Sequence, residues 1–256
     1  SNMLTTRELT GIAERKHLSL RHAEKDYLLE LLLYTISDVR RDLVFKGGTA
    51  LYKFYNLNRF SEDLDFDVVN KRLDVDRLTT QVLRHLELVG MGRTLLETSS
   101  YGKETNIRFT VRGPLYDGSK PSMSRVSMNL SRRERPQASQ DRFLAASYPD
   151  IPSFEVSVLD EREIAAEKVR CILTREKPRD VYDLWFLSKR AVQMDLSLIQ
   201  RKLKIYELRY DQVMFSRKIN EKRLMWSRNL SGLVIGTLPS FQTVSTELEA
   251  WSLTWR

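Results

Sequence analysis

The chain has little cysteine, little histidine and no long apolar run, and each shortage excludes a class of protein. A single cysteine, Cys171, among 256 residues excludes an internal disulfide. The three histidines, His17, His22 and His85, are too scattered to predict a shared metal site. The longest apolar run, residues 28–36, is well short of the roughly 20 residues that a membrane span requires. The sequence therefore predicts a cytoplasmic protein with no membrane partner.

Positive charge is in excess, with 42 Lys and Arg against 34 Asp and Glu and a net charge of +8. A basic surface favours polyanions through phosphate contacts and the release of counterions. Residues 120–142 and 201–228 concentrate this charge, and the second segment also contains four aromatic residues: Tyr206, Tyr210, Phe215 and Trp226. Such aromatics either stack on unpaired bases or pack in the core of a helical lobe. The charge favours an RNA partner, and the place of the aromatics stays open.

The hydrophobic pattern changes character part-way along the chain. The first part mixes the two periodicities, with strands predicted at 42–46, 64–69, 93–101, 104–113 and 124–130 and helices at 7–17, 22–39, 49–55 and 75–88. The polar, proline-bearing residues 131–153 predict a loop or hinge. A strand at 154–159 is followed by helices alone, at 161–175, 179–192, 195–207, 214–229 and 240–252.

This pattern predicts the α+β class, with a mixed sheet followed by an all-α part. We expect two lobes, an α/β lobe over residues 3–153 and a helical lobe over residues 154–256. The strand Phe154–Leu159 starts the second lobe in this division and is also a candidate member of the sheet. A cleft between two lobes is a frequent place for a ligand.

The most informative segment is KGGTALYKFYNLNRFSEDLDFD, residues 46–67. Gly47 and Gly48 stand at a predicted turn from strand to helix, where glycine lets the backbone approach a phosphate closely. The start of a helix also offers unpaired N–H groups and the positive end of the helix dipole. Gly47, Gly48 and the hydroxyl of Thr49 are therefore candidate ligands of a nucleotide triphosphate, and a plain tight turn is the alternative.

Three acidic residues alternate along the following strand, so that Asp63, Asp65 and Asp67 face the same way. Carboxylates this close repel one another, and proteins tolerate them at an exposed strand tip or around a cation. Mg²⁺ takes carboxylate and phosphate oxygens together. Asp63 and Asp65 are the candidate metal ligands, for Mg²⁺ or Mn²⁺. A phosphate-binding turn beside two carboxylates indicates metal-assisted chemistry on a nucleotide.

A second group of charges lies at the start of the helical part. Lys168 and Arg175 are seven residues apart, so they share one face of a helix, and Arg179, Asp180 and Asp183 open the next helix. Helix capping with solvated charges is the alternative to a binding role.

These residues together resemble the AbiEii family of nucleotidyltransferase toxins, within the DNA polymerase β-like superfamily. Gly47-Gly48-Thr49 and Asp63-Leu64-Asp65 match its glycine and Asp-x-Asp motifs. Lys168 to Arg175 and the Arg-Asp-x-x-Asp motif that ends at Asp183 match its later motifs. The resemblance covers roughly residues 40–190 and implies a polymerase β-like nucleotidyltransferase lobe.

The resemblance also implies residue roles. Asp63 and Asp65 become metal ligands, Lys168 a ligand of the nucleotide phosphates, and Asp183 a catalytic acid or base. Arg175 and Arg179 add charge for the leaving pyrophosphate, and Asp180 orients a neighbouring cation. The superfamily often adds a third carboxylate from a neighbouring strand, and the corresponding strand here offers Asn129.

The implied reaction transfers NMP from an NTP to a hydroxyl acceptor, for which the tRNA 3′ end is a candidate, in a toxin paired with a separate antitoxin protein. Two alternatives stay open: a nucleotide- or RNA-binding module without activity, and a nucleotidyltransferase acting on a small, antibiotic-like molecule.

Overall fold

The computed structural model describes residues 2–256, which form two compact units. The first unit extends to Phe54 and resumes over Phe60–Val158. The second contains the short segment Tyr55–Arg59 together with Leu159–Arg256. The chain therefore contributes to the second unit before it has completed the first. Within the described residues no helix is both long and apolar enough for a membrane span.

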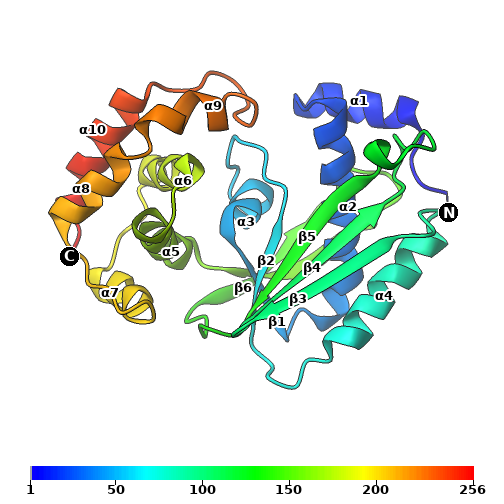
Figure 1. Ribbon diagram of the computed structural model, residues 1–256, viewed down its shortest axis with the longest axis horizontal. Coiled ribbons are helices and arrows are strands. Elements are labelled where there is room, and N and C mark those ends of the chain that lie inside the picture. The colour runs from blue at the N-terminus through cyan, green and yellow to red at the C-terminus, as the bar shows by residue number, and fades with distance from the viewer. Residues whose placement is uncertain (1) are drawn as a thin grey trace. The chain divides into compact units, whose positions relative to one another are not determined.

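The first unit is built on one mixed sheet of seven strands, shown as arrows in Figure 1. Its spatial order is β3-β4-β5-β2-β1-β7-β6. The pairs β2–β5 and β1–β7 are parallel, whereas β1–β2, β3–β4 and β4–β5 are antiparallel. The strands are β1 Leu43–Lys46, β2 Leu64–Val68, β3 Leu95–Tyr101, β4 Glu104–Val111, β5 Ser124–Ser131, β6 Ser139–Leu144 and β7 Phe154–Leu159.

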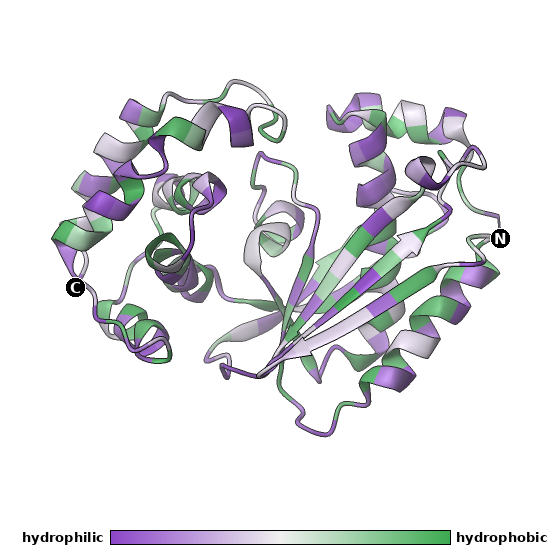
Figure 2. Ribbon diagram, viewed as in Figure 1, coloured by the Kyte–Doolittle hydropathy of each residue, from purple (hydrophilic) through white to green (hydrophobic). Residues whose placement is uncertain are grey.

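Four α-helices complete this unit: α1 Thr6–Lys16, α2 Leu20–Ile36, α3 Gly47–Phe54 and α4 Val75–Leu88. Helix α4 begins where the carboxylate of Asp74 accepts a hydrogen bond from the Arg77 backbone N–H, and it buries Leu78, Val82 and Leu86 along one face. Figure 2 shows the hydrophilic residues that share this helix with them. Helix α2 differs, because Leu28–Leu33 is buried all the way round and packs against α4 and β5.

Alternation along the strands gives the sheet two different faces. One face buries apolar side chains such as Phe66 of β2, Met128 of β5 and Phe109 of β4. The opposite face carries polar side chains at the alternate positions, among them Asp65 and Asn129. The predicted α+β class with a mixed sheet is confirmed.

Two predicted elements were wrong. The predicted loop 131–153 contains β6, which lies at the edge of the sheet and is exposed over most of its length. An edge strand buries little, so its sequence carries little of the apolar alternation that reveals a strand. The single helix predicted at 214–229 is two helices, α8 Gln212–Asn220 and α9 Trp226–Leu230, separated by a 3₁₀ turn at Arg223–Met225.

The second unit is helical after the end of β7. Its other α-helices are α5 Glu161–Thr174, α6 Pro178–Lys189, α7 Leu196–Lys204 and α10 Phe241–Ser252, and α5 contacts α6, α7 and α8. Aromatic residues form much of the interior: the Phe215 ring lies 5.3 Å from that of Trp255, and the Trp226 ring lies 5.5 Å from that of Phe241. Phe215 and Trp226 are buried. The structure therefore places these two aromatics in the core, away from stacking on bases.

Candidate functional site

The glycine turn lies where β1 ends and α3 begins. Gly47 has φ +78°, a backbone conformation that residues with a Cβ rarely adopt. A Cβ at this position would lie 2.9 Å from Oδ2 of Asp65. The absence of a side chain therefore lets the backbone of the turn lie directly against the acidic strand. The first N–H groups of α3 begin at this point, as the sequence predicts for a phosphate-binding turn.

Thr49 ties this turn to the acidic segment. Its side chain is buried, and its hydroxyl contacts Oγ of Ser61 at 2.7 Å and the backbone carbonyl of Asp63. The sequence made this hydroxyl a candidate ligand of a triphosphate, and in the structure it bonds to Ser61 and Asp63. Thr49 thus fixes α3 relative to the residues just before β2.

The acids on β2 have different surroundings. Lys46 pairs with Asp67 through an Nζ–Oδ1 distance of 2.7 Å, and Asp67 is fully buried. Lys46 therefore neutralises a carboxylate two residues beyond Asp65. Within residues 2–256, half-buried Asp65 has no salt bridge. Glu62 forms a salt bridge with Lys25, and Asp63 is half-buried ahead of the strand.

A row of amides extends from Asp65 across the sheet. Asp65 is in register with Asn129 of β5, which is in register with Asn106 of β4. Nδ2 of Asn129 donates to Oδ1 of Asp65 at 2.9 Å, and Nδ2 of Asn106 donates to Oδ1 of Asn129. Asn129 thus lies beside Asp65, on the strand where the resemblance leads one to look for a third carboxylate.

The far end of α3 is anchored by a buried charge cluster. Nζ of Lys53, in the last turn of α3, lies 2.5 Å from Oδ1 of Asp26 and 2.9 Å from Oε1 of Glu30. Burial opposes the charge of Lys53, but the carboxylates of Asp26 and Glu30 outweigh it and raise the lysine pKa. Both acids belong to α2, so this cluster fixes the helix that carries the glycine turn.

The second group of predicted residues forms an ion-pair cluster in the helical unit. Asp183 is fully buried and accepts two hydrogen bonds from Arg59, from Nε to Oδ1 and from Nη2 to Oδ2, each at 2.6 Å. Lys168 lies between two carboxylates, with Nζ 2.8 Å from Oδ2 of Asp183 and 2.9 Å from Oδ1 of Asp180. Arg175 makes a two-pronged contact with Asp180 at 2.6 and 2.7 Å. Arg179 is half-buried in the first turn of α6.

Electrostatics keep this cluster ionised. Burial works against the charge of Asp180, but Lys168 and Arg175 outweigh it and hold the pKa of this carboxyl well below its usual range. Burial likewise opposes the charge of Asp183, and Arg59 and Lys168 lower its pKa. The same carboxylates overcome burial at Lys168 and raise its pKa. As arranged here, Asp183 resembles an anchor for two cations more than a group ready to exchange a proton.

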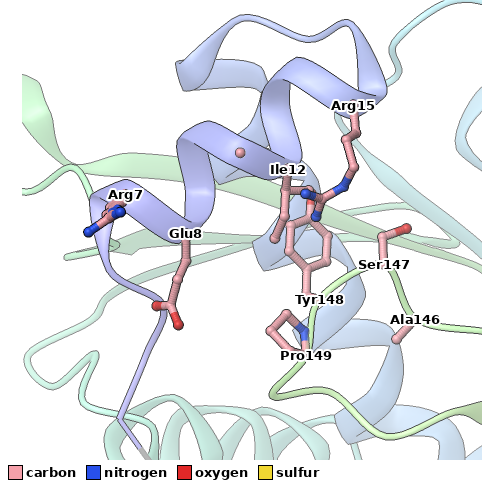
Figure 3. Close-up of a pocket in the computed structure, with 9 residues that line it drawn as sticks. Arg7, Glu8, Ile12, Arg15, Ala146, Ser147, Tyr148 and Pro149 are labelled. Carbon is pink, nitrogen blue, oxygen red and sulfur yellow. The ribbon is translucent and has the colours of Figure 1, made fainter.

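A cavity of about 490 Å³ lies elsewhere in the first unit, between α1 and the segment 146–149. Figure 3 shows Arg7, Ile12, Arg15 and Tyr148 among the side chains that line it. None of the predicted site residues belongs to its lining. This hollow is therefore separate from the glycine turn and the acidic strand.

Comparison with known protein families shows the family to which this chain belongs. The pattern of the nucleotidyl transferase AbiEii toxin family, of the Type IV toxin–antitoxin system, matches residues 31–247. The chain belongs to the AbiEii family. It is therefore a nucleotidyltransferase and the toxin of a toxin–antitoxin pair. AbiEii membership implies an NTP substrate, a divalent metal and an antitoxin.

Several solved structures share the fold of this chain. JHP933 from Helicobacter pylori has a TM-score of 0.63 and 20% identity, with 92% of each chain covered. A putative nucleotidyltransferase from H. pylori has a TM-score of 0.62 and 21% identity, covering 92% of this chain and 95% of that one. MenT4, a nucleotidyltransferase toxin from Mycobacterium tuberculosis H37Rv, has a TM-score of 0.63 and 23% identity, covering 99% and 91%. Among curated proteins none matches the chain.

The sequence singled out the glycines and acids of this AbiEii-family chain but missed part of their support. One part is Arg59, which forms an ion pair with Asp183. Another part is Asn106, whose place the sequence did not predict. The turn at Gly102 sets only the pairing of β3 with β4, and Asn106 faces Asn129 through the separate pairing of β4 with β5, for which the sequence carries no short-range signal.

Proposed function

We propose that this toxin transfers NMP from an NTP to the 3′ end of a tRNA in a Mg²⁺-dependent reaction. The observation that carries the proposal is the placement of Asp65. It is a half-buried carboxylate without a salt bridge in residues 2–256, and it lies against a glycine turn. Asp67, on the same strand, has its own counter-ion in Lys46. An acid left without a cation beside a phosphate-binding turn favours a metal-dependent phosphate site.

The residues present fit a hard divalent cation. Asp63 and Asp65 offer oxygen ligands of the kind that Mg²⁺ prefers, and the backbone of Gly47 leaves space beside Oδ2 of Asp65 that a Cβ would fill. We assign both carboxylates as metal ligands. When bound, Mg²⁺ or Mn²⁺ would supply positive charge to the phosphate oxygens.

Each unit offers its own candidate ligands for phosphate. The backbone N–H groups at Gly47 and Gly48, at the start of α3, would bind phosphate oxygens. Lys168, Arg175 and Arg179 would offset the charge that accumulates on the leaving pyrophosphate, with Asp180 and Asp183 holding the lysine and arginine side chains in place. The side chain of Arg175 is 41% exposed while it contacts Asp180, so part of this side chain is open to solvent.

The chemistry is one displacement at phosphorus. The hydroxyl oxygen of the acceptor forms a bond to the α-phosphorus, the bond from that phosphorus to the bridging oxygen breaks, and pyrophosphate leaves. The acceptor hydroxyl releases its proton to solvent, because Arg59 and Lys168 hold Asp183 as an ionised anchor and not as the predicted base. The excess of Lys and Arg supports an RNA acceptor, because a chain with a net charge of +8 attracts phosphates.

The first test is a transfer assay with total tRNA, Mg²⁺ and each radiolabelled NTP in turn. The wild-type chain should label tRNA with at least one NTP, and Asp65→Ala should abolish the label. Asp76→Ala, which removes an exposed carboxylate from the first turn of α4, is the matched control and should retain activity.

Each result has a defined reading. Turnover in Asp65→Ala at the wild-type rate would end the assignment of the site. Absence of label from every NTP, with nucleotide binding intact in calorimetry, would exclude tRNA as the acceptor and direct the search to small hydroxyl compounds through pyrophosphate release. Lys168→Ala should weaken NTP binding, and an unchanged Kd would remove Lys168 from the phosphate site.

A further inference from the structure

The polar face of the sheet carries an ordered chain of hydrogen bonds that ends at Asp65. Asn106, Asn129 and Asp65 occupy adjacent strands in register, so their side chains form one row. The carboxylate of Asp65, at one end of the row, decides which group donates in each hydrogen bond. An ionised carboxylate only accepts hydrogen bonds, so Asn129 must present its NH₂ group to Asp65 and its oxygen to Asn106. The NH₂ group of Asn106 then completes the row.

The row fixes one oxygen of Asp65 and leaves the other to the turn. Oδ1 accepts from Asn129 at 2.9 Å, while Oδ2 is the oxygen that a Cβ on residue 47 would approach to 2.9 Å. The two contacts therefore fix the rotation of the Asp65 carboxylate about its Cβ–Cγ bond. A metal ligand held in this way by a neighbouring donor meets the ion in a prepared orientation.

Other acids near this row contact a lysine or an arginine. Lys46 pairs with Asp67 at 2.7 Å and lies 3.8 Å from Glu134. Arg133 lies 3.4 Å from Glu104, the residue that precedes Asn106 by two positions on β4. A site that binds two cations about 4 Å apart requires carboxylates for both ions. Asn129 lies beside Asp65 and is neutral, so the amide row offers no further carboxylate to a second ion at this place.

We propose that Asn129, supported by Asn106, is a positioning residue for Asp65, and that it limits the site to one tightly bound divalent cation. This inference rests on the proposed function, because it takes Asp65 as a metal ligand. To the proposed function it adds the number of divalent cations that the site binds and the two residues that determine this number.

Binding of Mn²⁺ to the purified full chain, measured by electron paramagnetic resonance and calorimetry, tests the number of ions. The wild-type chain should bind one Mn²⁺ tightly. Asn129→Asp replaces the donor by a carboxylate that faces Asp65, so it should bind a second Mn²⁺ and be less thermally stable in EDTA than with Mn²⁺. Asn129→Ala should keep one site with an affinity lowered about 10-fold. Asn106→Ala should lower it less.

Asn229→Asp adds the same charge to an exposed position of α9 and is the control, with Mn²⁺ binding as in wild type. Two tight Mn²⁺ ions in the wild-type chain would overturn the inference. An Asn129→Ala variant with unchanged affinity would do the same, and this variant decides the matter even if Asn129→Asp fails to fold. Asp65→Ala separates the two proposals. If it binds Mn²⁺ normally, the metal site itself is wrong; if it loses Mn²⁺ while both Asn129 variants bind as wild type, only the role of Asn129 is wrong.

Discussion

Gly47 and Asp65 are in such close contact that a Cβ on residue 47 would lie 2.9 Å from Oδ2 of the carboxylate. The residues belong to α3 and β2 and are joined by a segment that passes through the other unit. Backbone in the left-handed region and a carboxylate at this distance both require glycine. The glycine turn and the acidic strand therefore depend on each other for their positions, and a substitution in either should displace the other.

Gly47→Ala tests this contact. The added methyl group would have to displace Asp65 or the turn, and φ +78° adds a strain of about 1 kcal/mol for a residue with a Cβ. We expect transfer to fall by about 100-fold, since a shift of 1 Å in a catalytic group has effects of that size. Gly92→Ala is the control, because a Cβ there meets nothing within 4 Å. Equal transfer by the two variants would contradict the argument.

Removal of divalent metal should stop the reaction reversibly. Treatment with EDTA should abolish transfer of label to tRNA, and added Mg²⁺ or Mn²⁺ should restore it, because Asp63 and Asp65 would hold the cation and the cation would supply positive charge to the phosphate oxygens. Circular dichroism should show the fold intact in EDTA, since the buried cluster of Lys53, Asp26 and Glu30 holds α3 without metal. Full activity in excess EDTA would rule out the metal-dependent reaction.

Asp180 should make stability depend on pH at the acid end. Its pKa in the folded chain is below the ordinary value of 3.8, so its contribution is present above that value and is lost as the pH falls toward the folded pKa. The pKa of Lys168 is raised, so this lysine stays protonated over the same range and adds no change of its own. Urea unfolding between pH 5 and 2.5 should show a smaller loss of stability on acidification in Asp180→Asn than in wild type. Parallel curves would show that Asp180 is not the source.

Arg59→Met should destabilise the helical unit. It removes the two-pronged partner of a carboxylate that is completely buried, and breaking such a pair costs about 3–5 kcal/mol. Arg59→Lys keeps the charge but cannot reproduce the two parallel hydrogen bonds, so we expect an intermediate loss. Denaturant unfolding measures both. Arg162→Met, which removes an exposed pair with Asp160, should change stability by less than about 1 kcal/mol. A loss no larger at Arg59 than at Arg162 would disprove the anchoring role.

The sequence predicted those parts of the site that depend on short-range rules. Glycines between a strand and a helix, and acids two residues apart on a strand, have local signatures, and Gly47 and Asp65 do meet. The family resemblance added what local patterns lack, and it is confirmed. The Arg59–Asp183 pair spans 124 residues and depends on how the helices pack, which periodicity does not specify. The amide row needed the order of strands, because Asn106 and Asn129 face Asp65 only when β5 lies beside β2.

The segment Tyr55–Arg59 has a consequence for how the chain acquires its structure during synthesis. It belongs to the helical unit, yet it leaves the ribosome before 99 residues of the other unit, Phe60–Val158. Arg59 must therefore wait for Asp183, and the helical unit cannot be completed co-translationally until the chain has grown past α6. For the same reason the unit cannot be excised by a single cut: a fragment that starts at Leu159 retains the buried carboxylate and leaves its arginine behind.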